Sequence, residues 1–205
     1  MIAIVDYNAG NLTSVKRALD FLGIPCEITN NARTIADAQR ILFPGVGHAR
    51  TAMETIRERG IDEGLREARE KGTPILGICL GTQIILEHSQ EGDTPCLGLI
   101  EGECIRMQPG ESRLKIPHMG WDSISLERTH PVLDGIRTGD EFYFVHSFCP
   151  SVSNRRAIVA TCDYGLTFPA AIGDGCIIAT QFHPEKSGPA GLALLSRFAQ
   201  WDGTC

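Results

Sequence analysis

The residue best placed to do chemistry is a cysteine in a short turn flanked by glycines. The segment Gly77-Ile78-Cys79-Leu80-Gly81 joins an apolar run, Pro74 to Ile78, to a helical pattern over about 82–88. It has the form G-x-C-x-G, the thiol analogue of the serine nucleophile elbow. Glycines suit this form because the sharp turn holds the nucleophile in a sparsely allowed conformation and crowds neighbouring Cβ atoms. The pattern therefore predicts that Cys79 is a nucleophile.

The same turn predicts how negative charge is stabilised. Cys79 stands where a helix begins, so the helix dipole and the free N–H groups favour thiolate over thiol. The N–H of Leu80 is placed to donate to an oxyanion. A second turn, Pro44-Gly45-Val46-Gly47, closes an earlier strand, and its two glycines permit another backbone N–H to turn toward a ligand. A plain strand-end turn explains this second motif equally well.

A thiol nucleophile needs a base, and the base needs an acceptor that orients it. His183 follows an apolar run over 176–180, and Glu185 follows two residues later, after Pro184. At the end of a parallel strand, His183 would lie at the same edge of the sheet as the cysteine turn. Together with that turn, the spacing predicts a base in His183 and a supporting carboxylate in Glu185.

We expect no chemistry from the other histidines and cysteines. The other histidines lack an acidic partner at such close spacing; they are His48, His88, His118, His130 and His146. No pair among the eight cysteines has C-x-x-C spacing, so we expect most of them to be reduced and buried. They stand at positions 26, 79, 96, 104, 149, 162, 176 and 205. The sequence therefore predicts neither a disulfide framework nor a metal site.

The elements that must position these residues alternate in the first half of the chain. Strands are expected at 2–6, 25–29, 40–43 and 74–78, and helices at about 11–22, 48–58, 62–71 and 82–88. Asn11 is expected to cap the first helix and Gly23 to end it. This alternation predicts a mostly parallel sheet with helices on both faces.

The second half has a different pattern. Strand-like runs occur at 97–100, 103–107, 141–148, 156–162, 168–172 and 176–182. We expect them to continue the sheet, partly antiparallel, or to form a layer beside it. A final helix over about 188–200 carries Leu192, Leu195, Phe198 and Ala199 on one face. With no repeat and no linker, the sequence predicts a single α/β domain over 1–205.

Composition and charge exclude several classes of protein. The chain has 205 residues, of which 42% are hydrophobic and 21% charged, which is ordinary globular usage. Its net charge of −6, with scattered basic residues, argues against nucleic acid and anionic membranes as partners. The apolar start stops at Asp6, which is too short for a signal peptide, so we expect a cytoplasmic protein.

Two segments resemble the class I glutamine amidotransferase family, which uses a Cys-His-Glu triad. These segments are Gly77 to Gln83 and Gln181 to Ser187. The resemblance narrows to the glutaminase subunits of imidazole glycerol phosphate synthases through the segments Asp6 to Leu12, Pro44 to Gly47, His118 to Asp122, Tyr143 to Ser147 and His183 to Gly191. It covers essentially the whole chain. It implies a flavodoxin-like three-layer fold with a β-rich second half.

The resemblance also implies a reaction and the residues that carry it. Cys79 would attack the side-chain amide of L-glutamine, and His183, supported by Glu185, would protonate the leaving ammonia. Gly47 and Leu80 would supply the oxyanion hole. The substrate would be held by Gln83 and by the backbone near His146 and Ser147. No cofactor is implied.

The resemblance further implies a partner. Ammonia would pass to a separate cyclase subunit, forming a heterodimer that makes imidazole glycerol phosphate and aminoimidazole carboxamide ribotide in histidine biosynthesis. The residues that match positions near this interface are Asn11, Trp121, Tyr143 and Lys186. Three positions depart from the family: Thr82 stands where methionine is common, Asp122 where asparagine is usual, and Asn8 where glycine is usual.

Two alternatives stay open at this point. The same glutaminase could feed a different ammonia-accepting synthase, such as one that modifies sugars or forms pyridoxal, and identifying the co-purifying synthase would separate the two. A binding or redox protein, or a cysteine peptidase, could use the same elbow. His183 and Glu185 argue against this second class, which has no need of a His-x-Glu motif on a late strand.

Overall fold

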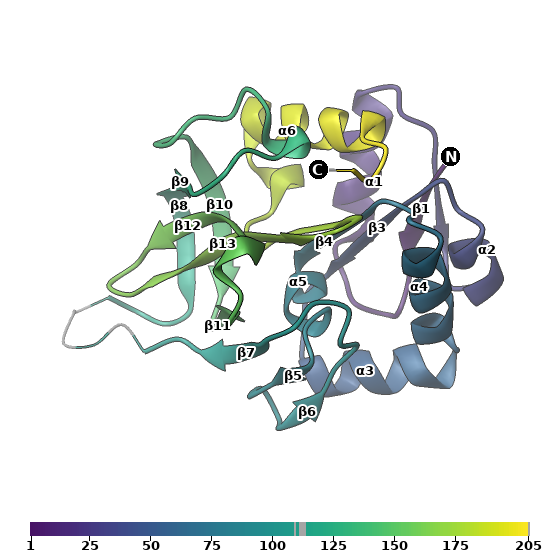
Figure 1. Ribbon diagram of the computed structural model, residues 1–205, viewed down its shortest axis with the longest axis horizontal. Helices are drawn as coiled ribbons and strands as arrows, with labels where there is room; N and C mark the ends of the chain where they lie inside the picture. The colour runs from purple at the N-terminus through teal and green to yellow at the C-terminus, as the bar shows by residue number, and fades with distance from the viewer. Residues whose placement is uncertain (109, 111–113, 205) are drawn as a thin grey trace.

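The computed structural model describes residues 1–108, 110 and 114–204, and in this part of the chain the largest sheet has eight strands (Figure 1). From edge to edge the strands are β2 (Cys26–Thr29), β1 (Ile2–Val5), β3 (Arg40–Gly45), β4 (Ile75–Cys79), β14 (Ile177–Thr180), β13 (Thr167–Asp174), β12 (Ile158–Asp163) and β9 (Ser125–Leu126). The first five are parallel, and the remaining pairings are antiparallel. Every residue of β1, β4 and β14 is buried, which is why these strands read as continuous apolar runs.

Helices cover both faces of the sheet (Figure 1). On one face, α1 (Leu12–Phe21) and α6 (Gly188–Gln200) contribute Val15, Leu19, Leu195 and Phe198 to one apolar core. The other face packs against α2 (Ala32–Ala36), α3 (Ala49–Glu58), α4 (Ile61–Glu70) and α5 (Leu80–Ile84). The predicted α/β class, with its mostly parallel sheet and helices on both faces, is confirmed.

The second half both continues the large sheet and adds smaller ones. Strands β14, β13 and β12 extend the sheet, as expected, and β9, which was not predicted, pairs with β12 at its edge. A separate pair joins β8 (His118–Ser123) to β10 (Glu141–His146). A four-stranded sheet has the order β11 (Phe148–Ser151), β7 (Glu103–Arg106), β5 (His88–Ser89) and β6 (Thr94–Pro95). Short 3-10 turns occur at Pro131–Leu133, Arg155–Ala157 and Pro184–Lys186.

Two expected elements were wrong, for one shared reason. The helix expected over 82–88 is α5, which ends at Ile84, and the run 97–100 is not a strand. Instead, the backbone N–H groups of this run donate to the carbonyls of Ile84, Ile85 and Leu86 at distances of 2.7–3.2 Å. The run therefore satisfies the carbonyls at the end of α5, which a longer helix would have bonded internally.

Other differences concern elements and faces that the pattern missed. The five-residue helix α2 and the strand β8 were not predicted. Helix α6 begins and ends where expected, but it buries Leu194, whereas Leu192 and Ala199 are only half-buried. Its buried face is therefore shifted relative to the four predicted positions, and α6 also packs against the turn at Pro131–Leu133.

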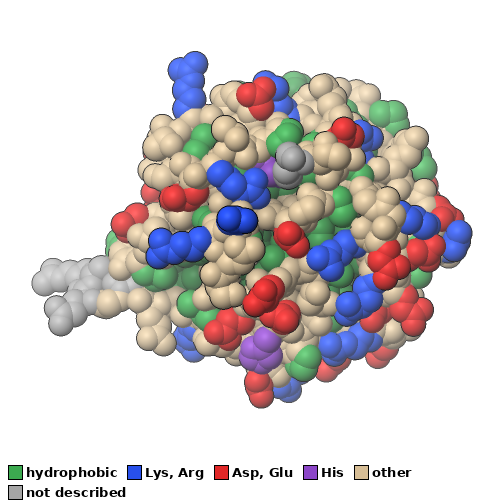
Figure 2. Space-filling model, in the orientation of Figure 1, with side chains coloured by type: hydrophobic (Ala, Val, Ile, Leu, Met, Phe, Trp, Pro, Cys, Tyr) green, Lys and Arg blue, Asp and Glu red, His purple; other side chains and the backbone are tan. Residues whose placement is uncertain are grey.

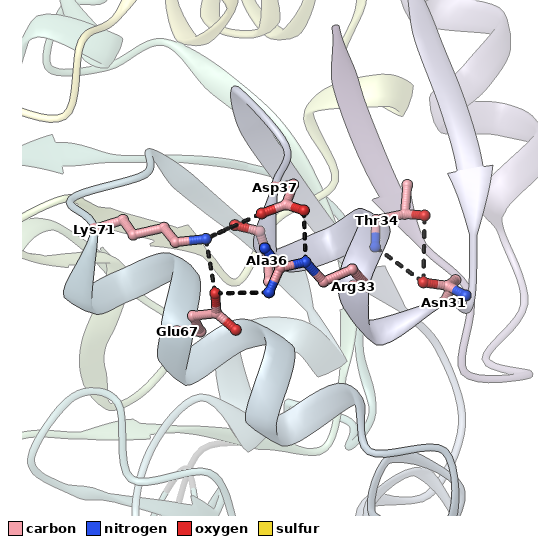
Figure 3. Close-up of polar contacts among 7 residues, drawn as sticks. All are labelled: Asn31, Arg33, Thr34, Ala36, Asp37, Glu67 and Lys71. Carbon is pink, nitrogen blue, oxygen red and sulfur yellow. Dashed lines mark hydrogen bonds and ion pairs between the residues drawn. The ribbon is translucent and has the colours of Figure 1, made fainter.

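Helix α2 is held on α4 by a close backbone approach and by an exposed ion network (Figure 3). A Cβ at Gly64 would lie 2.6 Å from the carbonyl oxygen of Ala32, so only glycine fits there. Around this contact, Lys71 is paired with Glu67 at 2.8 Å and with Asp37 at 3.1 Å, and Arg33 is paired with Asp37 at 2.7 Å. The packing is therefore apolar and close at the centre and charged at the rim.

The surface carries charges of both signs. On the face drawn in Figure 2, basic and acidic side chains are interspersed, most densely toward the side where α2 and α4 lie in Figure 1. Among the described residues, no helix has the length and apolar character needed to cross a bilayer. The same residues include no group of three or more His, Cys, Asp or Glu side chains arranged to hold a metal ion.

Candidate active site

The turn at Cys79 has the strained geometry that the sequence predicts. Strand β4 ends at Cys79, which has φ 54° and ψ −104°, and α5 begins at the next residue. The flanking glycines are required by packing: a Cβ at Gly81 would lie 1.8 Å from the carbonyl oxygen of Phe43, and one at Gly77 would lie 2.9 Å from the Cβ of Ala179. The neighbouring strands β3 and β14 therefore force small residues on both sides of the nucleophile.

His183 is brought to this turn by the parallel pairing of β14 with β4. Its ring is fully buried, and Nδ1 lies 2.7 Å from Oε1 of the equally buried Glu185. Its backbone N–H donates to the carbonyl of Tyr143 at 2.9 Å. Ser187 completes the turn by donating from Oγ to the His183 carbonyl at 2.6 Å. The backbone of His183 is therefore fixed by two hydrogen bonds, and its imidazole is held by the carboxylate on the Nδ1 side.

The charge on His183 is set by its neighbours. Burial alone would lower the pKa of the imidazole, but interactions with Cys79 and Glu185 outweigh burial and raise the pKa of His183 to about 9. The buried Nε2 atom has no hydrogen bond of ordinary geometry, although the thiol of Cys79 is close enough to act on the charge of the ring. The ring is therefore protonated at neutral pH and can act as an acid toward a leaving group.

Asn11 has a role that differs from the predicted one. It stands at the N-cap position of α1, but with φ 79° its side chain makes no capping hydrogen bond. Instead, Nδ2 donates to Oε1 of Glu185 at 2.5 Å. The expectation that its side chain caps the helix was wrong, because the amide is engaged by the buried carboxylate. Oε1 of Glu185 thus accepts from both His183 and Asn11.

The two residues expected to form the oxyanion hole share a small cavity. Gly47, with φ 124°, and Leu80 both line a space of about 100 Å³, together with Tyr7, Val46 and His48. The hydroxyl of Tyr7 is buried and has no hydrogen-bond partner. Burial, followed by the nearby Cys79, raises the pKa of this phenol well above its usual range. The hydroxyl is therefore a neutral group at this wall.

The residues expected to hold the substrate lie beside the nucleophile. Gln83 is buried, and its Nε2 donates to the carbonyl of Phe148 at 3.0 Å and to Oε1 of Gln181 at 3.2 Å. The ring of His146 is buried, and its Nδ1 bonds the same Phe148 carbonyl at 2.8 Å. The carbonyl of Ser147 accepts from the N–H of Met107 at 2.9 Å. Since both N–H groups of Gln83 are used, its Oε1 is the atom left for a ligand.

Sequence reasoning missed a second glutamine at the nucleophile. Gln181 is fully buried, and its Nε2 lies 3.8 Å from Sγ of Cys79. The signal was its position two residues before His183, directly after the buried strand β14. Thr82, one of the positions that departs from the family, donates from Oγ1 to the Thr180 carbonyl at 2.6 Å and so ties α5 to β14.

Other histidines have acidic partners, contrary to expectation. Nε2 of His118 lies 3.4 Å from Asp122, and Nε2 of His88 lies 2.9 Å from Asp93. These carboxylates follow four and five residues later, a spacing that the sequence argument did not consider. The other nitrogen of His118 bonds His146 at 3.1 Å. The departure at Asp122 therefore places a carboxylate at the end of a row of histidines.

The cysteines largely follow the expectation. Within the described residues all seven are free, and five of them are buried. Cys26 and Cys176 are partly exposed, so most of the described cysteines are buried, as expected. Cys205 lies outside the described residues.

The four residues expected near a partner interface gather beside the triad. The ring of Trp121 meets that of Tyr143 at 6.2 Å between centroids, and Nζ of Lys186 lies 5.8 Å from the centroid of Tyr143. Asn11 joins them through Glu185. Trp121 is 54% exposed and Met119, on the same strand, 62%. The exposed Trp121 thus packs against Tyr143, whose backbone carbonyl accepts from the N–H of His183.

Comparisons with known proteins identify the family of the chain. The family model described as glutamine amidotransferase class-I matches residues 3–200. The chain is 48% identical over 206 residues to imidazole glycerol phosphate synthase subunit HisH of Nitratidesulfovibrio vulgaris strain DP4, covering 98% of this chain and 96% of the relative. It is 45% identical over 203 residues to the subunit of the same name from Acinetobacter baylyi, covering 98% of both chains.

Solved structures show the same fold at lower identity. A glutamine amidotransferase crystal structure superposes with a TM-score of 0.74 at 21% identity, covering 98% of this chain and 100% of that one. The structure of PurLQS from Thermotoga maritima gives a TM-score of 0.75 at 18% identity, covering 97% of each chain. At this identity the likeness concerns the fold alone.

Proposed function

The chain belongs to the class I glutamine amidotransferase family, and on that premise we propose that Cys79, His183 and Glu185 are its catalytic triad. Its identity of 45–48% over nearly the full length to HisH subunits makes it the glutaminase subunit of an imidazole glycerol phosphate synthase, an enzyme of histidine biosynthesis. The observation that supports the triad best is the buried His183–Glu185 pair, which lies beside a cysteine held in a strained elbow.

The first chemical step follows from the charges. The Cys79 sulfur attacks the side-chain carbonyl carbon of glutamine, and a C–S bond forms while the carbonyl becomes an oxyanion. The protonated His183 gives its proton to the amide nitrogen, the C–N bond breaks, and ammonia leaves. A glutamyl thioester remains. The N–H groups of Gly47 and Leu80 are proposed to bind the oxyanion, a contribution worth ~10²–10³ in rate for each donor.

The second step regenerates the site. Neutral His183 accepts a proton from water as the water oxygen attacks the thioester carbon. The C–S bond then breaks, glutamate leaves, and the sulfur is freed with the protonated imidazole again beside it. Glu185 makes no bond in either step. It supports the positive ring, and Asn11 holds the shared Oε1 atom at 2.5 Å.

The partner is proposed to be a cyclase subunit that consumes the ammonia, as in a heterodimeric synthase. Support comes from the exposed Trp121 and Met119 next to Tyr143 and Lys186, because apolar and aromatic side chains are enriched where proteins meet. L-glutamine is the proposed substrate, with Gln83 and the backbone near His146 and Ser147 around it. The proposed location is the cytoplasm.

Replacing the nucleophile tests this proposal. Cys79→Ala should abolish glutamate release from glutamine, because it removes the thiol that lies beside the imidazole of His183. The same variant, bound to the cyclase subunit and given ammonium salt, should still form imidazole glycerol phosphate. Cys176→Ala is the matched control, because Cys176 is a partly exposed cysteine at the other end of β14, and it should keep both activities. Glutamate release by Cys79→Ala at the wild-type rate would show that the nucleophile is misassigned.

A further inference from the structure

The sulfur of Cys79 has two neighbours of opposite hydrogen-bonding character. Its S–H can donate to the carbonyl of Val145, which lies 3.8 Å from Sγ. On another side, Nε2 of Gln181 lies 3.8 Å from Sγ and donates to it. A carbonyl can only accept, so it suits the thiol, whereas an amide N–H suits the thiolate. The site thus contains one partner for each protonation state of the nucleophile.

The orientation of the Gln181 amide is set by the backbone carbonyl of Phe148, acting through the side chain of Gln83. The carbonyl of Phe148 can only accept, so the atom of Gln83 that lies 3.0 Å from it must be Nε2. The second hydrogen of that same Nε2 needs an acceptor, so the atom of Gln181 at 3.2 Å must be Oε1. The NH2 group of Gln181 therefore points at Cys79. The side chains of Gln83, Gln181 and Cys79 are buried, so water does not offer an alternative partner that would turn the Gln181 amide around.

We propose that Gln181 is a further catalytic residue, whose N–H stabilises the thiolate of Cys79, and that Gln83 is the positioning residue that keeps this N–H turned toward the sulfur. The proposal rests on the assignment of Cys79 as the nucleophile. When the sulfur loses its proton, the Val145 carbonyl loses its donor and the Gln181 N–H gains a charged acceptor. The same N–H donates to the negative sulfur again when the thioester breaks.

Titration of the thiol separates this role from a structural one. The rate of alkylation of Cys79 by iodoacetamide, followed on the Cys79 peptide by mass spectrometry, measures the thiolate at each pH. In Gln181→Met, which keeps the volume but removes the donor, the midpoint of this curve should move to higher pH. Because hydrogen bonds to charged groups contribute more than neutral ones, kcat for glutamate release should fall about ten- to a hundredfold with little change in KM.

Two further variants give the test its controls. Gln181→Glu keeps the shape but replaces the donor by an acceptor, so its midpoint should move at least as far as that of Gln181→Met. It also covers the case in which Gln181→Met does not fold. Thr82→Val removes an equally buried hydrogen bond between α5 and β14 without touching the sulfur, and its midpoint should match the wild type. Gln83→Met should shift the midpoint in the same direction as Gln181→Met, by less.

The outcomes distinguish this proposal from the assignment of the triad. A wild-type midpoint in folded Gln181→Met and Gln181→Glu would overturn the role of Gln181, even if Cys79→Ala is inactive. An equal shift in Thr82→Val would reduce Gln181 to a packing residue. Full glutamate release by Cys79→Ala would instead remove the premise on which the role of Gln181 depends.

Discussion

At His183, opposing effects of burial and of neighbouring charges decide the chemistry. Burial disfavours a charged ring, and the pKa of His183 nevertheless rises to about 9, because Cys79 and Glu185 stabilise the imidazolium. A group whose folded pKa lies above its unfolded value contributes stability that is fully present below about pH 6.5 and is lost as pH rises through about 9. The same charge that stabilises the fold is the proton that the leaving ammonia takes.

The pH profile of the reaction should show this proton. We expect kcat/KM for glutamine hydrolysis to fall above about pH 9, where His183 loses its charge. In Glu185→Gln the fall should begin at lower pH, since a neutral amide supports the imidazolium less than a carboxylate does. Stopped assays of glutamate release between pH 6 and 10.5 would measure both curves. Identical curves for the two proteins would contradict the supporting role of Glu185.

The part of the site that sequence could predict is the part held by short-range spacing. Cys79 is recognisable because its glycines are adjacent to it, and Glu185 because it follows His183 by two residues. The contact between Asn11 and Glu185 spans 174 positions, and that between Gln181 and Cys79 spans 102. No local pattern encodes such pairs, because they depend on which strands become neighbours in the sheet.

Between elements, close packing and surface charge contribute very differently. Helix α2 meets α4 through Gly64, where a side chain would strike the backbone of Ala32, and through the exposed ions around Lys71. Exposed ion pairs contribute little, because water and salt screen them. Overpacking a fixed backbone contact typically costs about 1–3 kcal/mol. The glycine should therefore determine the stability of this junction.

Two substitutions at this junction compare the effects. Gly64→Ala should lower the free energy of unfolding by about 1–3 kcal/mol, because α2 must move away from α4. Lys71→Met, which removes the centre of the ion network in Figure 3, should leave the urea midpoint nearly unchanged. Urea unfolding followed by circular dichroism at low and high salt would measure both. A larger loss of unfolding free energy in Lys71→Met than in Gly64→Ala would contradict this ranking of the two contributions.

Long periodic elements were predictable, and elements defined by distant partners were not. The bounds of α6 follow from its own sequence, where Pro189 stands in the first turn and the apolar positions recur at helical spacing. Helix α5 stops at Ile84 because the run 97–100 bonds its last carbonyls. Similarly, β8 is a strand because β10 pairs with it, and not because of its composition. The second half, which is rich in such pairings, was therefore predicted only in outline.

Across the whole molecule, buried neutral histidines make the fold sensitive to acid. Burial lowers the pKa of His146 to about 3 and that of His130 to about 4, and it lowers the pKa of His118 as well. The unfolded chain binds these protons near pH 6.5, and the folded chain does not. Stability is therefore fully present above about pH 6.5 and is lost as pH falls.

We propose that the two apolar cores on either side of the shared sheet unfold together as a single domain over 1–205.

This sensitivity can be measured by unfolding. Each such histidine lowers the free energy of unfolding by up to ~1.4 kcal/mol per pH unit below its unfolded pKa. We expect the urea midpoint to fall steeply between pH 6.5 and pH 4.5. In His130→Asn the dependence of the unfolding free energy on pH should be weaker by one proton. The asparagine side chain can still accept from the Val132 N–H, as Nδ1 of His130 does at 3.2 Å. An unchanged slope in this variant would show that His130 is protonated in the folded chain.

Strand β14 lies in the middle of the sheet but late in the sequence, so the two halves of the active site are synthesised at different times. Cys79 and its partner Gln181 lie 102 positions apart, and ribosomes add about 5–20 residues per second, so the nucleophile is made ~5–20 s before its base. During that interval the thiol has no imidazole, so the emerging chain cannot hydrolyse glutamine. A chain ended after Asp174 should therefore show no glutamate release, and a stalled ribosome series should gain activity only once β14 and the His183 turn have left the tunnel.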